Sequence, residues 1–369
     1  MRDKSDTGDR TDKSNDNNLS RNQTIDIVKG LCIIFVLINH TDWNHQERLK
    51  YLFPFWIEMA VPVFMIISGY VHAISFKNRK INSFSKSFNL SLFVNRSIRY
   101  TIPFIIIYCI EYIFLLMTNK INLGWNFFIH LITGGIGPGS YYYPLIIQFL
   151  LIYSCIYFFI KKWEAGGLVT IGIFNLLYEL FQYSYNLNDS CYRLLIFRYI
   201  FLIGYGCYLA TSKRKIKRIW NLFSMGLGGA FILLTQYFNI VPPFFNYNWS
   251  GTSCLAVLFI LPIVPYFLQL DLKCPFIEVT GKFSYSIFLI QMAYFAIFSG
   301  YVSLSNMTIW LQLIINISII MTIGIIFHLW QEKIVFYLLF KIADLDFAKF
   351  LGVFMKYCND ILTSDDLNI

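Results

Sequence analysis

The stretch that decides the fold is TIDIVKGLCIIFVLINHTDW, Thr24 to Trp43, a mostly apolar run interrupted by a few ionisable residues. At 100° per residue, Lys29 lies about 60° and His40 about 40° from Asp26 around a helix, so the three share one face. Such a group near the bilayer centre costs about 3 kcal/mol on insertion scales. This face is therefore predicted to turn toward a bundle interior or a wet cavity, where ionisable groups indicate a functional site.

The composition is that of an integral membrane protein. Of the 369 residues, 57% are hydrophobic and only 14% are charged, which lies well outside the soluble norm. The net charge of +9 does not indicate nucleic-acid binding, because the basic residues fall in short clusters between apolar stretches, as the positive-inside rule requires. The eight cysteines are scattered without a Cys-x-x-Cys pair or a Cys/His cluster, so neither a disulfide framework nor a metal site is indicated.

Apolar stretches long enough to cross a bilayer predict an all-α, polytopic membrane protein with about ten transmembrane helices in one bundle. The stretches lie near residues 24–43, 54–76, 100–118, 143–160, 166–184, 194–212, 219–239, 252–270, 283–300 and 307–328. Around them, residues 1–23 are predicted to be a disordered cytoplasmic tail and residues 331–369 a cytoplasmic interfacial helix and tail. Residues 24–330 are then the transmembrane domain.

Loop charges predict the orientation. With a cytoplasmic amino terminus, fifteen Lys and Arg residues fall in inner loops and four in outer loops, which places both termini in the cytoplasm of an inner (plasma) membrane protein. The outer segments are instead rich in aromatic residues, as in Tyr141–Pro144. Such rings either stack on sugar faces or form the ordinary interfacial belt.

Lys29 and His40 lie near opposite ends of the first helix, eleven residues or about 16 Å apart. That length resembles a pantetheine arm, so an acyl-CoA whose nucleotide stays in the cytoplasm could bring its thioester to His40. The imidazole could then deprotonate a sugar hydroxyl for attack on the thioester, or carry the acyl group covalently. Alternatively, His40 snorkels to the interface, and Lys29 forms a plain ion pair with Asp26.

Further polar groups accompany this stripe. Arg96 and Arg99 stand one turn apart before the third span, where two guanidiniums suit nucleotide phosphates or act only as topology signals. Glu111 lies near mid-span, so its carboxylate should be protonated or paired, with Arg198 as a candidate partner. Whether Glu111 and Arg198 pair depends on which helices are neighbours in the bundle.

Ser68-Gly69-Tyr70 is predicted to end a helix that contains Pro62. Such a break frees backbone amides that could bind an oxyanion or a phosphate, although a kink that only aids packing is the alternative. The other histidines lack a comparable constellation and are interpreted as structural: His45, His72, His130 and His328.

These motifs together are similar to those of the membrane-embedded acyltransferase-3 family. The most specific are Asp26-x-x-Lys29-Gly30 with His40 eleven residues after Lys29, and the segment from Pro62 to Tyr70. The remaining motifs follow in the family's order: Arg96-x-x-Arg99-x-x-x-Pro103, Tyr142-Tyr-Pro144, Phe201-Leu-Ile-Gly204 and Gly281-x-x-Ser284-Tyr-x-Ile-Phe-Leu289. The likeness covers nearly all of residues 24 to 330.

The resemblance implies an O-acetyltransferase that moves an acyl group, most simply from acetyl-CoA, to a hydroxyl of a surface polysaccharide or lipid-linked sugar. It implies His40 as the catalytic histidine and Lys29, Arg96 and Arg99 as the cofactor-binding cluster. The chain departs from the family in carrying Lys29 where many members have Arg, and Gln291 where His is common. We assign Gln291 no proton-transfer role, because an amide is neither acid nor base.

Two other classes of function remain open. A transporter or flippase for a lipid-linked sugar would also need polar groups along a cavity, although the sequence shows no paired hydrophobic halves. A non-catalytic scaffold in a glycan-synthesis complex would tolerate loss of His40 and Lys29 together. The sequence does not indicate an oligomeric state.

Overall fold

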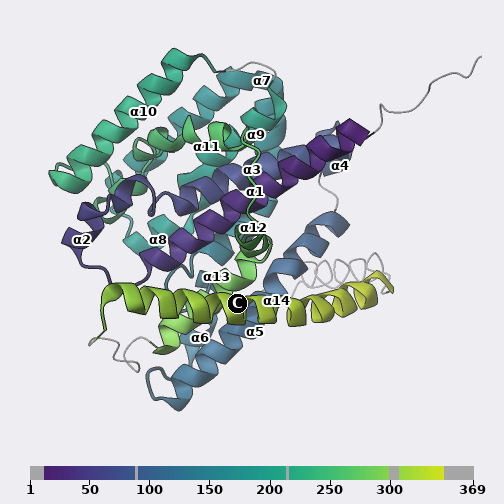
Figure 1. Cartoon of the computed structure of the whole chain (residues 1–369), viewed down its shortest axis with the longest axis vertical. Helices are drawn as coiled ribbons and strands as arrows, with labels where there is room; N and C mark the ends of the chain where they lie inside the picture. The colour runs from purple at the N-terminus through teal and green to yellow at the C-terminus, as the bar shows by residue number, and fades with distance from the viewer. Residues whose placement is uncertain (1–11, 88–89, 213–215, 299–306, 345–369) are drawn as a thin grey trace, which may run out of the picture.

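The computed structural model describes residues 12–87, 90–212, 216–298 and 307–344, and over these residues it contains helices and no strands (Figure 1). The predicted all-α class is confirmed. The α-helices are α1 (Asp12–Asn39), α2 (His45–Lys50), α3 (Ala60–Asn78), α4 (Phe84–Ser87), α5 (Leu90–Met117), α6 (Trp125–Thr133), α7 (Tyr142–Ser184), α8 (Asp189–Leu194), α9 (Ile200–Thr211), α10 (Arg218–Ile232), α11 (Ile263–Phe267), α12 (Pro275–Lys282), α13 (Ser284–Phe298) and α14 (Ile309–Asp344). The short segments are η1 (Phe53–Phe55), η2 (Ile196–Tyr199), the π-helical η3 (Leu233–Tyr237), η4 (Tyr247–Thr252) and η5 (Ala256–Ile260).

Five helical segments within the described residues are long and apolar enough to cross a membrane, and a sixth is the pair α12 and α13, which is bent by 73°. The five are Phe53–Asn78, Phe93–Met117, Tyr142–Ser184, Arg218–Tyr237 and Ile309–Leu339. The protein is thus a membrane protein, and the predicted count of about ten helices is not confirmed.

The count differs because two predicted spans merge, one breaks into short pieces, and two are not among the candidate spans: 24–43, which lies largely in α1, and 194–212, whose helix Ile196–Thr211 is shorter. The stretches 143–160 and 166–184 both fall in α7, which is interrupted by the non-helical backbone of Glu164. Residues 252–270 form only short segments, η5 and α11 among them. Hydropathy alone cannot distinguish a continuous helix from such pieces, because their apolar content is the same.

The two terminal elements extend beyond the predicted domain limits. α1 begins at Asp12, so residues 12–23, which were assigned to the tail by composition, continue the first helix. At the other end α14 runs without a break to Asp344, so residues 331–344 continue the last span. Residues 1–11 and 345–369 lie outside the described residues.

The structure corrects the prediction that Ser68-Gly69-Tyr70 ends a helix, because α3 runs through these residues to Asn78. Pro62 falls in the first turn of α3, where the missing N–H has no intrahelical partner to lose. A Cβ on Gly69 would overlap the carbonyl oxygen of Ile203 in α9. Gly69 therefore serves close packing between α3 and α9.

A second close crossing joins α1 to α12. A Cβ on Gly30 would overlap the carbonyl oxygen of Ile277, and one on Gly281 would overlap that of Asp26. The two backbones therefore touch directly at this point. The crossing places Lys29, which precedes Gly30, beside the bend between α12 and α13.

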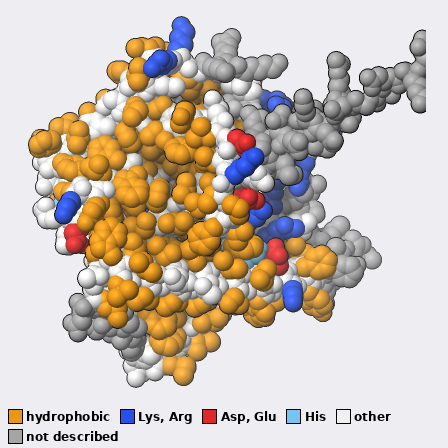
Figure 2. All heavy atoms as spheres, in the orientation of Figure 1, with side chains coloured by type: hydrophobic (Ala, Val, Ile, Leu, Met, Phe, Trp, Pro, Cys, Tyr) orange, Lys and Arg blue, Asp and Glu red, His pale blue; other side chains and the backbone are white. Residues whose placement is uncertain are grey.

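The surface agrees with a membrane location. Figure 2 shows hydrophobic side chains over most of one face, with Lys and Arg side chains gathered mainly along one margin. α10 and α14 both contribute to the exposed apolar surface, through residues such as Trp220, Phe223, Ile326 and Trp330. Such a large exposed apolar surface is unusual for a protein in water, and in a membrane lipid would cover it.

Candidate functional site

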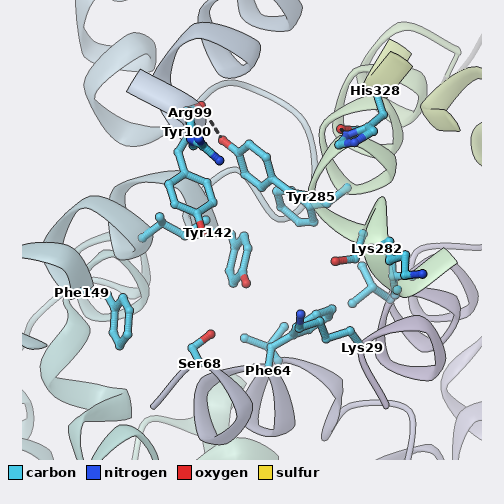
Figure 3. A pocket seen from close by; sticks show the side chains of 18 of the residues that line it. Lys29, Phe64, Ser68, Arg99, Tyr100, Tyr142, Phe149, Lys282, Tyr285 and His328 are labelled. Carbon is cyan, nitrogen blue, oxygen red and sulfur yellow. Dashed lines mark hydrogen bonds between the residues drawn. The ribbon is translucent and has the colours of Figure 1, made fainter. Parts of the chain in front are cut away.

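Two cavities lie within the helix bundle. The first, which we call the Lys29 cavity, has a volume of about 400 Å³ and is lined by Lys29 of α1, Arg99 of α5 and His328 of α14, among others. Figure 3 shows side chains from these helices arranged around it, with the Tyr142 ring projecting toward the middle. The second, which we call the His40 cavity, has a volume of about 410 Å³ and includes His40 in its lining.

The two cavities meet at four side chains that line both of them, Val36 of α1, Val61 of α3, Tyr142 of α7 and Phe288 of α13. We call these four residues the neck. The rings of Tyr142 and Phe288 are 4.9 Å apart, so the neck is narrow and mainly apolar. The Lys29 cavity and the His40 cavity therefore have the side chains of the neck as a common boundary.

One face of α1 runs along both cavities. Lys29, Ile33 and Val36 line the first cavity, and Val36 and His40 line the second. These positions follow i, i+4, i+7 and i+11, the spacing of a single helical face. His40 directly follows α1 and keeps its register, because its N–H donates to the carbonyl of Val36 (3.2 Å). The stripe inferred from the sequence therefore faces protein cavities.

The Lys29 cavity has a basic rim. Lys29 Nζ donates to Asp26 Oδ1 at 3.0 Å, and Lys282 makes an ion pair with Glu278 at 2.7 Å. Arg99 is exposed and also lines the cavity. Three cations thus converge here, and among the described residues the ion-pair partners of Lys29 and Lys282 are carboxylates of their own helix.

Arg96 lies one turn before Arg99 but is not part of the cavity lining. Its Nη2 atom donates to Ser75 Oγ (3.5 Å), and its guanidinium lies 6.0 Å from the centre of the Phe76 ring. The structure therefore brings Arg99 and Lys29 to one cavity and leaves Arg96 beside it, packed against α3.

A polar cluster in the Lys29 cavity joins α13 to α14, and sequence reasoning missed it. Ser286 Oγ is 3.0 Å from His328 Nδ1 and accepts a hydrogen bond from Gln331 Nε2 (2.7 Å). His328 Nε2 lies 3.2 Å from Glu332 Oε1. The sequence signals were the i, i+3 spacing of His328 and Gln331 and the i, i+4 spacing of His328 and Glu332, whereas their partner Ser286 lies on another helix.

The His40 imidazole is positioned by packing against its neighbours and not by hydrogen bonds from the described residues. Its ring lies 6.2 Å from that of Phe295, and its Nε2 atom would be 3.9 Å from a Cβ on Gly139. Among the residues that the structure describes, none hydrogen-bonds to the imidazole. Both ring nitrogens are thus uncommitted within a cavity, and one free nitrogen is enough to exchange a proton with a ligand.

Arg48 braces the segment beside His40, and sequence reasoning did not assign it a role. It donates to Asn39 Oδ1 (2.7 Å) and makes an ion pair with Glu58 (2.9 Å). Arg48 lies in α2, Asn39 ends α1 and Glu58 precedes α3. The ion pair therefore fixes the α1–α2 connection against the start of α3, and both charges line the His40 cavity.

The structure does not bring Glu111 and Arg198 together. Glu111 is fully buried and accepts a hydrogen bond from the N–H of Gly137 (2.8 Å). Arg198 is only 2% exposed and lies against the rings of Trp249, Tyr192 and Tyr199, at 4.5, 5.0 and 5.1 Å. The predicted pairing is corrected accordingly: Glu111 fixes a glycine-rich loop, and Arg198 borders the His40 cavity.

Of the remaining predicted residues, Ser68 lines the Lys29 cavity, and its carbonyl is 3.0 Å from His72 Nδ1. The Gly69 carbonyl accepts from the Tyr153 hydroxyl (3.3 Å). Tyr70 is buried in the core and lines neither cavity. Ser68 is thus the one residue of this motif that is placed to meet a ligand.

Over the described residues, the fold is that of an all-helical membrane protein with two cavities that share four lining side chains. The chain matches the acyltransferase-3 model, described as an acyltransferase domain, over residues 22–330, and it belongs to this family. No curated protein and no solved structure matches it. The family supports membrane acyl transfer as the class of activity.

Proposed function

We propose that the protein transfers an acyl group, in the simplest case acetyl from acetyl-CoA, to a hydroxyl of a surface polysaccharide or lipid-linked sugar. The observation that carries this proposal is the meeting of the two cavities at one neck, with Lys29 and Arg99 on one side and His40 on the other. A donor and an acceptor can then enter from opposite ends and meet inside the protein.

The Lys29 cavity suits the donor. Lys29, Arg99 and Lys282 supply positive charge at its rim, where the phosphates of a CoA nucleotide would bind. From Lys29 to His40 the helix rises about 16 Å, a distance that an extended pantetheine arm covers. In this proposal the Lys29 end faces the cytoplasm of an inner-membrane protein, in agreement with the excess of basic residues in the predicted inner loops.

His40 suits the role of general base. The acceptor hydroxyl would give its proton to the imidazole while its oxygen forms a bond to the thioester carbonyl carbon. The carbon–sulfur bond then breaks, and the CoA thiolate leaves and takes up a proton. Tyr142 and Phe288 are in contact at the neck, so in this proposal their side chains move apart to let the acyl group reach His40, which favours a small or slender group.

The test is His40→Ala in reconstituted full-length protein, with labelled acetyl-CoA as donor and surface glycan from cells that lack the protein as acceptor. We expect transfer to fall by about 10²- to 10⁴-fold, the usual contribution of a general base. Binding of acetyl-CoA should be unchanged, because the Lys29 cavity is intact.

His40→Gln serves as a second variant, since an amide keeps hydrogen-bonding capacity but cannot take the proton. His130→Ala, in α6 and outside both cavities, is the matched control and should transfer normally. Wild-type transfer by His40→Ala would end the proposal. Movement of a lipid-linked sugar across vesicles without consumption of acetyl-CoA would instead support a transporter.

A further inference from the structure

One wall of the His40 cavity carries polar N–H groups without partners. We call it the Arg193 wall and define it by Arg193, Arg198 and Trp249. Of the ten buried side-chain nitrogen and oxygen atoms that lack a hydrogen-bond partner among the described residues, four belong to these three residues. All four are donors: Arg193 Nε, Arg198 Nε, Arg198 Nη1 and Trp249 Nε1. Because these atoms are buried, the wall acts on the cavity through the positive charges of its two guanidiniums, which lack local acceptors at these positions.

Arg193 and Trp249 line the cavity directly. The Arg193 guanidinium lies over the ring of Tyr141 at 5.8 Å, and no carboxylate of a described residue lies within 4.0 Å of it. By contrast, the other arginine of the lining, Arg48, is neutralised by Glu58 at 2.9 Å. Arg193 is therefore the cation of this lining that is free to bind an anion.

Arg198 lies next to the wall's lining residues. It contacts Trp249 and Tyr199 and donates to the hydroxyl of Thr252, all of which line the cavity. The aromatic rings stabilise the buried guanidinium through cation–π contacts, and they leave its Nε and Nη1 atoms without acceptors. Its charge thus adds to that of Arg193 at this wall.

Two carboxylates from the same part of the chain, Asp189 and Glu179, are engaged by neutral donors. Asp189, four residues before Arg193 in α8, accepts from the side-chain amides of Asn246 and Asn248. Glu179 accepts from the hydroxyl of Tyr192 at 2.8 Å. The negative charges of the two carboxylates offset part of the positive charge of the wall, as Glu179 does for Arg198, but neither carboxylate lies within 4.0 Å of the guanidinium nitrogens.

We propose that the His40 cavity binds an acceptor with an anionic oxygen group, a carboxylate or a phosphate, and that Arg193 contacts this group. This inference rests on the proposed function, in which the His40 cavity holds the acceptor, and it adds the chemical class of that acceptor. An acidic sugar supplies the carboxylate, and a phosphorylated or lipid-linked sugar supplies the phosphate. A guanidinium suits both, because each presents two oxygens in the spacing of its N–H groups.

The test measures binding of purified full-length protein to three forms of surface glycan from cells that lack the protein. The forms are untreated, carboxyl-reduced to neutral sugars, and dephosphorylated. We expect untreated glycan to bind about tenfold more tightly than one of the two treated forms, as a charge-assisted contact would give. Whichever treatment lowers binding identifies the anion. Equal binding of all three forms would overturn the inference.

The residue is tested in parallel. Arg193→Gln should bind untreated glycan as weakly as the neutralised form, and Arg193→Lys should keep part of the preference because it keeps the charge. Arg218→Gln, at the exposed start of α10, is the matched control and should behave as wild type. A full preference in Arg193→Gln would rule out Arg193 as the contact. Acetyl-CoA binding reports whether each variant is folded.

Transfer of labelled acetyl separates this inference from the proposed function. If transfer occurs equally to untreated and neutralised glycan, the proposed function stands and the anionic acceptor is wrong. If no form is acetylated while untreated glycan still binds preferentially, the anion site stands and the transfer proposal fails.

Discussion

The Lys29 cavity and the His40 cavity are nearly equal in volume, but they hold their charges differently. At the Lys29 cavity the cations pair within their own helix, Lys29 with Asp26 and Lys282 with Glu278. At the His40 cavity a single guanidinium, Arg48, ties the end of α1 to the residue before α3 through Asn39 and Glu58. The first arrangement is local, and the second joins separate elements.

This difference indicates what each end can do. Ion pairs within one helix are worth only about 0.3–0.5 kcal/mol, so the basic side chains of the Lys29 cavity can be redirected to a ligand at little cost. The bonds of Arg48 fix backbone segments, so the His40 cavity keeps its shape. An adaptable end suits binding of a flexible anionic donor, and a rigid end suits alignment of reacting atoms.

The largest effect is expected from removing two basic side chains of the Lys29 cavity, which tests whether this cavity binds the donor. The double variant Lys29→Ala/Arg99→Ala should raise the KM for acetyl-CoA by about 10²- to 10⁴-fold, since each of the two charge-assisted contacts contributes about 1.5–3 kcal/mol. Its kcat at saturating donor should change little. Steady-state kinetics over a range of salt concentrations measures both. A fall in kcat at unchanged KM would show that these cations do not bind the donor.

The next effect concerns the neck between the two cavities. Phe288→Ala removes the ring that packs on Tyr142 at 4.9 Å, so a bulkier acyl group should pass. We expect the ratio of kcat/KM for butyryl-CoA to that for acetyl-CoA to rise about tenfold, in the range that small changes of pocket size produce. Phe298→Ala, at the exposed end of the same helix, should leave the ratio unchanged. An unchanged ratio in Phe288→Ala would mean that donors do not use the neck.

The smallest effect is expected from Glu58→Gln, which tests whether the Arg48–Glu58 ion pair keeps the His40 cavity in shape. The amide oxygen can still accept from Arg48, but the charge pair is lost, and both groups are part-buried. We expect kcat to fall by about two- to fivefold, because a partly exposed ion pair contributes about 0.5–1 kcal/mol. The KM for acetyl-CoA should not change. A change in the KM for acetyl-CoA without a change in kcat would show that Glu58 acts on donor binding and not on the shape of the His40 cavity.

The alignment of Lys29 with His40 could be predicted because a helix fixes it locally. Eleven residues at 100° each bring the two side chains close to one face whatever the rest of the chain does. Arg48 and Arg193 could not be assigned in this way, since loop charges look alike in a sequence. Their roles depend on Glu58 and Tyr141, which meet them only in the folded chain.

Predictions that required knowledge of helix adjacency failed for the same reason. Glu111 meets Gly137 of a loop, whereas Arg198 meets Trp249 from a distant part of the chain. The helix end predicted at Ser68-Gly69-Tyr70 was wrong for another reason. A glycine can allow two helices to cross closely as well as end a helix, and Gly69 does the former. Only the neighbouring helix, α9, decides between the two.

The apolar neck also has an electrical consequence. Two wet vestibules that approach each other from opposite sides of a bilayer would short-circuit the proton gradient if they joined. Val36, Val61, Tyr142 and Phe288 present no formal charge between them, and hydrophobic constrictions of this kind exclude water. In the proposed mechanism, the residues that a slender acyl chain passes would also insulate the membrane between turnovers.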